Sequence, residues 1–154
     1  MIELKVYNAN PKKRKTTDCV IRALSVASGK DYETVFRELV DIAIKTGYMI
    51  NEKHCYDKWL ENNGFEKMPQ PRHHDGTKYL VGDVDKLLHF NEYKCVVSMA
   101  NHVSCVVDNK LIDIWDCRRK SISNYYVKKL EAKDRDRISH LEDNVKVKAR
   151  RIEL

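Results

Sequence analysis

The chain has 154 residues, of which 42% are hydrophobic and 34% are charged. A chain of this length is typical of one domain with one core, and its apolar content excludes wholesale disorder. The formal net charge of +6 permits attraction to a polyanion but does not establish it, because basic runs are most often solvated.

The number of cysteines and the character of the N-terminal residues indicate in which cellular compartment the protein acts. There are five cysteines, an odd number, and the first residues form too short and too charged a stretch for a signal peptide. No apolar run approaches the roughly 20 residues that span a bilayer. We therefore expect a cytoplasmic protein with reduced thiols and no membrane association.

The N-terminal residues predict a short strand and then a helix. Residues 2–7 alternate apolar and polar side chains with the period of a half-buried strand. Apolar residues then recur at helical spacing after a cap at Thr17 or Asp18, and Gly29 ends the pattern. Cys19 is thereby placed in the first turn of this helix.

Two further helices are expected before the sequence changes character. One runs over residues 31–45, and the other follows a cap at Asn51 and ends at residues 63–64. The residues expected on the buried face of the first of these are Val35, Phe36, Leu39, Val40 and Ala43. Residues 69–76 form the clearest loop, and a short helical stretch over 83–89 follows.

The second half of the chain is richer in β-branched and aromatic residues and predicts strands. Four such segments follow one another, at residues 93–99, 103–107, 110–114 and 122–127. Asp108 and Asn109 favour a tight hairpin turn between two of them. A chain whose helices come first and whose strands then form an antiparallel meander is predicted to belong to the α+β class.

The domain organisation follows from the same patterns. Residues 1–130 are expected to form a single domain. Residues 131–154 are densely charged with scattered apolar positions, and we interpret them as an extension packed on, or continuing, the same domain. A helix followed by an edge strand, or a partly mobile tail, fits this composition.

Cys19 and His102 are the candidate nucleophile and base of a catalytic site. A helix N-terminus carries about half a positive charge and unpaired amide donors, which lower the pKa of a thiol in the first turn. His102 lies at the start of a predicted strand, where a sheet packed on that helix would fix its ring. The pair predicts a thiolate activated by an imidazole.

An acidic residue on the following strand would orient the imidazole. If residues 108–109 form a two-residue turn, Asp113 lies diagonally adjacent to His102 on the same face of the sheet. A three-residue turn would instead bring Asp116 opposite His102. We favour Asp113 and keep Asp116 as the alternative.

Three short stretches around these residues resemble small papain-like (C39-like) cysteine peptidase domains of phages and bacteria. They are Thr-Asp-Cys-Val-Ile-Arg-Ala-Leu at 17–24, Asn-His-Val-Ser-Cys-Val-Val at 101–107 and Leu-Ile-Asp-Ile-Trp-Asp at 111–116. Their order is that of the family, with cysteine on the first core helix, histidine on a strand and Asp or Asn on the next. Asp113-Ile114-Trp115 is also similar to the Asn-Ser-Trp of papain relatives, whose aromatic ring shields the third residue.

The resemblance, which covers residues 8–127, implies a papain-like fold with N-terminal helices packed on a C-terminal antiparallel sheet. It implies that a Cys-His-Asp triad cleaves an amide, thioester or isopeptide bond of a peptide or protein substrate. Neither a metal nor an organic cofactor is required by that mechanism. The chain departs from the family in having no glutamine before Cys19 to stabilise the oxyanion. The amide of Cys19 can supply one donor, and the candidates for the second are Asn8, Asn10 and Thr17.

Two other functions fit the sequence less well. A catalytically inactive papain-like module, encoded by a phage, would use its basic segments to bind a protein or nucleic-acid partner. A dedicated nucleic-acid-binding domain is not favoured, since its support is limited to Tyr125, Tyr126, Lys128 and Lys129. Nothing in the sequence indicates an oligomeric state.

The remaining chemistry-bearing residues have simpler interpretations. Zinc is not expected at His54, Cys55, His73 and His74, because their spacing is not that of a ligand set. Arg22 is expected to pair with an acid. The other cysteines, Cys95, Cys105 and Cys117, are expected to pack as small apolar groups, with Cys105 on the sheet face opposite His102. The acidic residues expected on a solvated face are Asp134, Asp136, Glu142 and Asp143.

Overall fold

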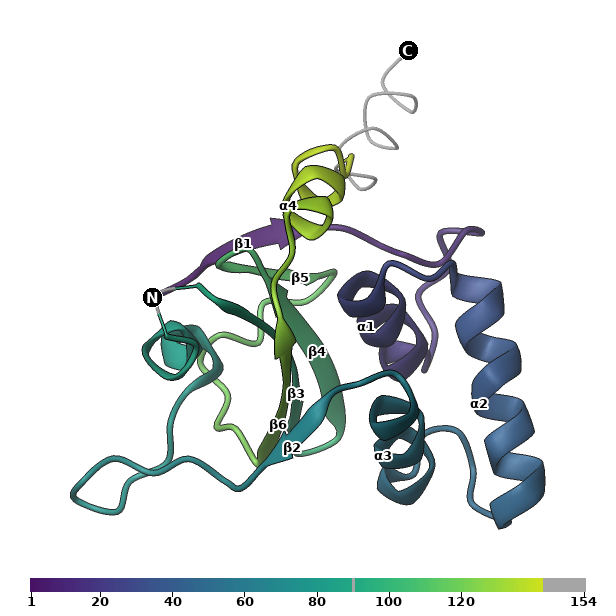
Figure 1. Ribbon diagram of the computed structural model, residues 1–154, viewed down its shortest axis with the longest axis horizontal. Helices are drawn as coiled ribbons and strands as arrows, with labels where there is room; N and C mark the ends of the chain where they lie inside the picture. The colour runs from purple at the N-terminus through teal and green to yellow at the C-terminus, as the bar shows by residue number, and fades with distance from the viewer. Residues whose placement is uncertain (90, 143–154) are drawn as a thin grey trace.

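The computed structural model describes residues 1–89 and 91–142 and has an α+β fold built around a mixed sheet (Figure 1). Its six strands lie in the order β1-β5-β4-β3-β6-β2. The strands are β1 (Glu3–Val6), β2 (Glu66–Met68), β3 (Tyr93–Met99), β4 (His102–Val107), β5 (Lys110–Asp113) and β6 (Asn124–Lys129). The helices are α1 (Cys19–Ser28), α2 (Tyr32–Thr46), α3 (Lys53–Asn62), the 3-10 helix η1 (Val81–Leu87) and α4 (Ala132–Ser139).

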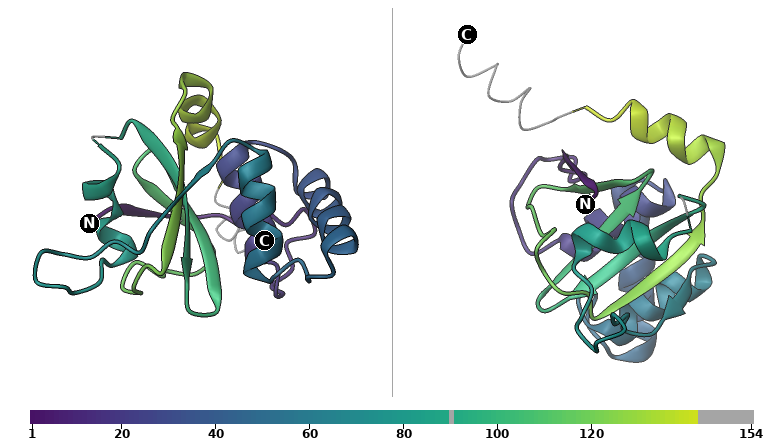
Figure 2. Two further views of the ribbon diagram at one scale, coloured as in Figure 1. Left: turned by 60° about the horizontal axis from the view of Figure 1, so that its bottom comes forward. Right: turned by 90° about the vertical axis from the view of Figure 1, so that its left-hand side faces the viewer.

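The sheet separates two hydrophobic clusters. Helices α1, α2 and α3 lie on one side of it and η1 lies on the other, as the views in Figures 1 and 2 agree. Along β4, Val103 and Cys105 belong to the cluster that contains the helices, whereas Val106 belongs to the cluster on the η1 side. This alternation is the period of two that a strand imposes. Cys105 accordingly faces the helices.

The helix boundaries follow the local signals of the sequence. Helix α1 begins at Cys19, and its C-cap Gly29 has a φ of 82°, in the left-handed region that glycine adopts without strain. Helix α2 is capped by Asp31, whose side chain accepts a hydrogen bond from the amide of Thr34 at 3.0 Å. The expected starts and stops of these two helices are confirmed.

The expected two-residue turn between β4 and β5 is confirmed as well. Asp108 and Asn109 have φ values of 51° and 62°, both positive, as the hairpin turns that match strand twist require. Val107 pairs with Lys110 across the turn. This register determines which residues of β5 reach the end of β4 where His102 lies.

The strand connectivity differs from the expected antiparallel meander. Strand β6 pairs with β3 rather than β5, and β5 pairs instead with β1 in parallel. The edge strand β2, which the sequence did not predict, pairs with β6. Because β1 occupies the free edge of β5, the chain after β5 crosses back to the open edge of β3. The sheet is therefore mixed.

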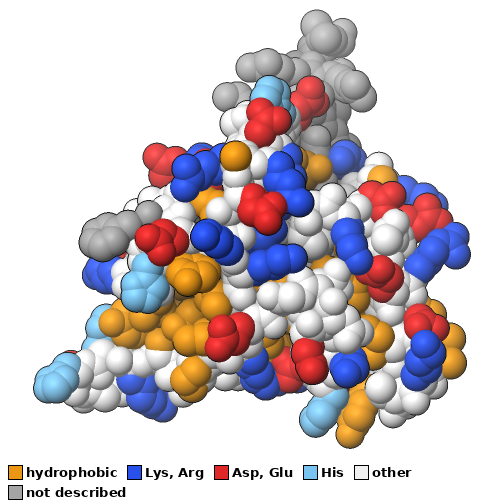
Figure 3. All heavy atoms as spheres, viewed as in Figure 1, with side chains coloured by type: hydrophobic (Ala, Val, Ile, Leu, Met, Phe, Trp, Pro, Cys, Tyr) orange, Lys and Arg blue, Asp and Glu red, His pale blue; other side chains and the backbone are white. Residues whose placement is uncertain are grey.

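The buried face of α2 also differs from the expectation. Its buried residues are Val35, Leu39 and Ile42, whereas Phe36 is 40% exposed. Helix α2 is the outer helix, packed on α1 and α3, and contributes one narrow stripe to the core. Hydrophobic side chains are accordingly visible at the edge of the molecule over α2 (Figure 3).

Two expectations outside the sheet are corrected. The N-cap of α3 is Glu52 rather than Asn51, whose side chain instead donates to the carbonyl of Thr17 at 3.3 Å. Asp134 is buried rather than solvated, because the ammonium of Lys94 and the guanidinium of Arg137 lie 3.0 and 2.9 Å from its carboxylate.

The C-terminal extension is described only in part. Residues 132–139 form α4, which is the helix expected in this extension. The expected edge strand and Asp143 lie outside the described residues. Across the part of the chain that the structure describes, no helix combines the length and the apolar character needed to cross a bilayer.

Candidate active site

The fold brings Cys19 and His102 into contact. Cys19 is the first residue of α1, and His102 is the first residue of β4, the strand against which α1 packs. The turn that precedes His102 contains Asn101 with a φ of 57°, so β4 starts immediately after β3 ends. The thiol of Cys19 interacts with the side chain of His102 and with the backbone of Val103, and the three residues line one cleft.

These contacts favour the thiolate form of Cys19. Burial raises the pKa of the thiol, but the hydrogen bonds with His102 and Val103 outweigh it, with help from the nearby charges of His102 and Arg22. The pKa of Cys19 consequently lies below its ordinary value. A depressed pKa at a helix N-terminus beside a histidine is the setting of a nucleophilic cysteine.

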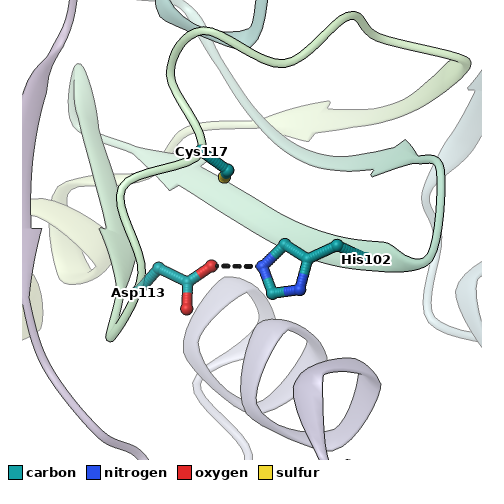
Figure 4. A group of neighbouring side chains, drawn as sticks. All are labelled: His102, Asp113 and Cys117. Carbon is teal, nitrogen blue, oxygen red and sulfur yellow. Dashed lines mark hydrogen bonds and ion pairs between the residues drawn. The ribbon is translucent and has the colours of Figure 1, made fainter.

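The imidazole of His102 is held from its other side by Asp113. Its Nε2 lies 2.7 Å from Oδ2 of Asp113, and the second ring nitrogen points toward the helix that begins at Cys19 (Figure 4). Burial lowers the pKa of His102, but hydrogen bonds with Asp113 and with two thiols raise it to about 11. The geometry therefore favours an imidazolium between a carboxylate and a thiolate.

Asp113 is almost completely enclosed, with 2% of its surface exposed. Its Oδ2 also accepts a hydrogen bond from the hydroxyl of Ser104 at 2.7 Å, and its Oδ1 accepts one from the amide of Ile114 at 2.7 Å. Burial raises the pKa of Asp113, but its hydrogen bonds with His102 and Ser104 prevail and lower it. Asp113 is thus fixed in position as a carboxylate.

A buried arginine extends the arrangement behind Asp113. The guanidinium of Arg22 lies 2.9 Å from Oδ1 of Asp113 and 2.9 Å from Oδ1 of Asp18. Oδ2 of Asp18 accepts hydrogen bonds from the hydroxyl of Tyr32 at 2.8 Å and from the amide of Asn10 at 3.0 Å. One turn of α1 therefore carries the nucleophile, and the next carries the arginine that anchors the acid.

Trp115 covers the hydrogen bond between His102 and Asp113. The rings of Trp115 and His102 meet edge to face, with centroids 4.7 Å apart and planes at 81°. The indole itself is 44% exposed. The indole therefore packs against the imidazole and is itself partly open to solvent.

Asp116, the alternative orienting acid, lies elsewhere. Its carboxylate is exposed and receives hydrogen bonds from the guanidinium of Arg118 at 2.8 and 2.9 Å, which lower the pKa of Asp116 to about 2. The two-residue turn between β4 and β5 accounts for this arrangement, because it brings Asp113 to the level of His102.

A cleft of about 580 Å³ opens at the two reactive side chains. Besides Cys19 and His102, the lining includes Thr16, Thr17, Asn51, Lys53, Tyr56, Met99 and Asn101. Most of these residues carried no functional signal in the sequence, because they come from separate parts of the chain: three connections, helix α3 and the end of β3. The sequence pointed to Asn51 only as a helix cap, whereas in the structure Asn51 lines the cleft and Glu52 is the cap.

Only one of the three side chains expected as oxyanion donors lies in the cleft. Thr17 lines the cleft, whereas Asn8 and Asn10 are buried and do not line it. The side-chain amide of Asn10 donates to Asp18, and that of Asn8 donates to the carbonyl of Arg14 at 3.2 Å. The first backbone hydrogen bond of α1 is donated by the amide of Arg22 to the carbonyl of Asp18. The amide of Cys19 precedes it in the first turn, where backbone amides have no acceptor within the helix and can donate to an oxyanion.

One group of side chains has the composition of a metal site. Among the described residues, His102, Asp113 and Cys117 place one ligand atom each within 4.8 Å of the others (Figure 4). Cys117 is fully buried, and its Sγ lies within 4.8 Å of a ring nitrogen of His102, a contact beyond the apolar packing expected for it. A cation would have to displace the hydrogen bond between His102 and Asp113, and it would face the charge of Arg22. The donor set thus fits a metal poorly.

The other histidines considered for zinc are occupied by aromatic contacts. His54 stacks on Tyr48 and His73 stacks on Tyr79, with ring centroids 4.5 and 3.8 Å apart. Cys55 is buried in the helical cluster. Within residues 1–89 and 91–142, these side chains do not form a ligand group.

No protein-family model, curated protein or solved structure matches the chain.

Proposed function

We propose that this protein is a cysteine hydrolase with a papain-like site, which cleaves an amide, isopeptide or thioester bond of a peptide or protein. The observation that carries the proposal is the position of His102, whose ring lies between the Asp113 carboxylate and the Cys19 thiol. A nucleophile, a base and an orienting acid in one hydrogen-bonded row are the parts of a catalytic triad.

In the first half of the reaction the Cys19 thiolate attacks the carbonyl carbon. The oxyanion receives a hydrogen bond from the Cys19 amide at the start of α1, and Thr17 and Asn51 on the cleft wall are candidates for the second donor. The tetrahedral intermediate collapses as the His102 imidazolium donates its proton to the leaving amine. The acyl group remains on Cys19 as a thioester.

In the second half His102, now neutral, takes a proton from a water molecule. The resulting hydroxide equivalent attacks the thioester carbonyl, and the acid product leaves as Cys19 returns to the thiolate and His102 to the imidazolium. Asp113 stabilises the imidazolium at both stages and stays ionised, because Ser104 and Arg22 hold its carboxylate. No organic cofactor enters this sequence of steps.

The arrangement of elements supports a papain-like fold. The nucleophile begins the first helix, the base begins a central strand, and the acid ends the adjacent strand with a tryptophan two residues later. The mechanism needs a reduced thiol, and all five cysteines are free. Both features fit a protein that acts in a reducing compartment such as the cytoplasm.

The test is hydrolysis of a mixed peptide library, followed by mass spectrometry. We expect time-dependent cleavage that is abolished in Cys19→Ala and retained in Cys55→Ala, a buried thiol elsewhere. Circular dichroism would verify that both variants fold. Cleavage that persists in folded Cys19→Ala would exclude Cys19 as nucleophile, and a wild-type chain inert toward peptides and thioesters would contradict the proposal.

A further inference from the structure

A basic side chain without a counter-ion lies in the cleft. Lys53, at the start of α3, lines the cleft beside the nucleophile, and its ammonium hydrogen-bonds with the side chain of Asn124. Among the described residues it makes no ion pair. The neighbouring Asp57 is engaged by Lys67 at 2.9 Å and by the hydroxyl of Tyr126. Burial, followed by the charge of Lys67, lowers the pKa of Lys53.

A second lysine without an ion pair among the described residues lies beside Trp115, the residue that packs on the catalytic histidine. The ammonium of Lys120 is 5.7 Å from the centroid of the Trp115 ring, which in turn packs on His102. Lys120 is exposed and makes no ion pair within the described part of the chain. The carboxylate nearest in sequence, Asp116, is held by Arg118.

Negative charge is missing from the cleft wall. Among the described residues that line it, there is no aspartate or glutamate, and the positive charge of Arg22 is balanced by Asp18 and Asp113. Lys53 in the cleft and Lys120 beside Trp115 therefore both place positive charge, without an ion-pair partner in the described part of the chain, near the reacting residues. Such a field concentrates anionic groups at the nucleophile and repels cationic ones.

We propose, on the basis of the hydrolase function above, that the site selects peptide segments with aspartate or glutamate side chains on both sides of the bond presented to Cys19. Lys53 contacts one acidic side chain in the cleft, and Lys120 contacts the other across the face of Trp115. A peptide fits better than a nucleic acid, because Lys53 is the one lysine among the described residues that line the cleft, and a single lysine provides no continuous row of phosphate contacts.

The charge preference can be measured without knowing the substrate, by using two alkylating reagents of similar shape. Iodoacetate carries a negative charge and iodoacetamide is neutral, so the ratio of their rates at Cys19 reports the local field. In Lys53→Met and in Lys120→Met we expect this ratio to fall by about two- to fivefold each, the effect of one charge several ångströms away in a solvated cleft. The matched control is Lys133→Met on α4, which lies at the other end of the sheet from the turn before His102 (Figure 1).

The outcomes separate the two proposals. If iodoacetamide modifies Cys19 rapidly but the ratio is the same in wild type and both variants, the acidic preference is wrong and the hydrolase function stands. If neither reagent modifies Cys19 faster than the buried thiols, the hydrolase function itself fails.

A protection experiment decides between acidic peptide and nucleic acid. We expect an oligoglutamate peptide to slow the modification of Cys19 by iodoacetamide more than an oligothymidylate of equal charge does. This protection should weaken in Lys53→Met. Stronger, salt-sensitive protection by the oligothymidylate would overturn the assignment to an acidic peptide.

Discussion

Arg22 and Asp113 form a buried ion pair, with 2.9 Å between guanidinium nitrogen and carboxylate oxygen. Their side chains are 8% and 2% exposed. Arg22 lies three residues after Cys19 on α1, and Asp113 holds the imidazole that contacts Cys19. The same helix therefore presents the nucleophile and restrains the acid, so that a shift of α1 would disturb both together.

Replacing Arg22 by methionine should destabilise the fold. The change leaves the buried carboxylate of Asp18 without its cation and leaves Asp113 with His102 alone, and removal of one partner of a buried pair costs about 3–5 kcal/mol. Urea unfolding would measure the free energy of unfolding. The exposed pair formed by Arg37 and Glu33 offers the control, since Arg37→Met should leave the urea midpoint unchanged. Equal midpoints for the two variants would contradict the role given to Arg22.

Replacing Asp113 by asparagine should narrow the pH range of activity from its alkaline side. Asp113 is the largest of the contacts that raise the pKa of His102 to about 11, and an amide carries no charge to maintain its share of that shift. The pKa of His102 therefore falls, and its ability to protonate the leaving group is lost at lower pH than in wild type. The pH profile of peptide cleavage measures this descending limb. An alkaline limb at the same pH in Asp113→Asn and wild type would exclude Asp113 as the orienting acid.

Asp116 provides the matched comparison for that experiment. It lies three residues from Asp113, but its carboxylate is exposed and bound by Arg118. Asp116→Asn should leave both limbs of the pH profile in place. A profile altered in Asp116→Asn and unaltered in Asp113→Asn would reassign the acid.

Trp115→Ala should reduce the rate of cleavage more than it reduces stability. Loss of the indole admits water to the hydrogen bond between His102 and Asp113, which weakens it, whereas a side chain that is 44% exposed contributes little to the core. Parallel measurements of kcat and of the urea midpoint would separate the two effects. Trp115→Phe, which keeps an aromatic face, should restore most of the rate. A rate unaffected by Trp115→Ala would argue against shielding.

Treatment with a chelator should leave the reactivity of Cys19 unchanged. His102, Asp113 and Cys117 lie close enough to bind a thiophilic cation, but the proposed mechanism uses His102 and Asp113 free of metal. Alkylation of Cys19 after dialysis against a strong chelator, with and without added zinc, measures the dependence. Reactivity that disappears with the chelator and returns with zinc would favour a metal centre.

Local signals in the sequence were sufficient to predict the central geometry. The expected cap at Thr17 or Asp18 placed Cys19 at the start of the first helix, and Asp18 is the N-cap. The turn at Asp108 and Asn109 set the register of β4 and β5, which places Asp113 near His102. Both signals are local, since each depends on the backbone conformation of one or two residues.

Features that depend on contacts distant in sequence were not predictable in the same way. Cys117 reaches His102 from an irregular segment after β5, where no periodicity indicates the path of the chain. Asp134 is buried because Lys94, 40 positions earlier, meets it inside the protein. Strand β6 pairs with β3 because β1 already occupies the edge of β5, and no property of residues 122–127 themselves encodes that choice.

The pH dependence of Cys19 alkylation, compared between wild type and His102→Ala, tests the central pairing most directly. In wild type we expect iodoacetamide to modify Cys19 at pH values below the ordinary titration of a thiol, because the imidazolium stabilises the thiolate. In His102→Ala the rate should rise only at higher pH. If the two profiles coincide in folded protein, the thiol of Cys19 is not activated by His102, and the proposed site is wrong.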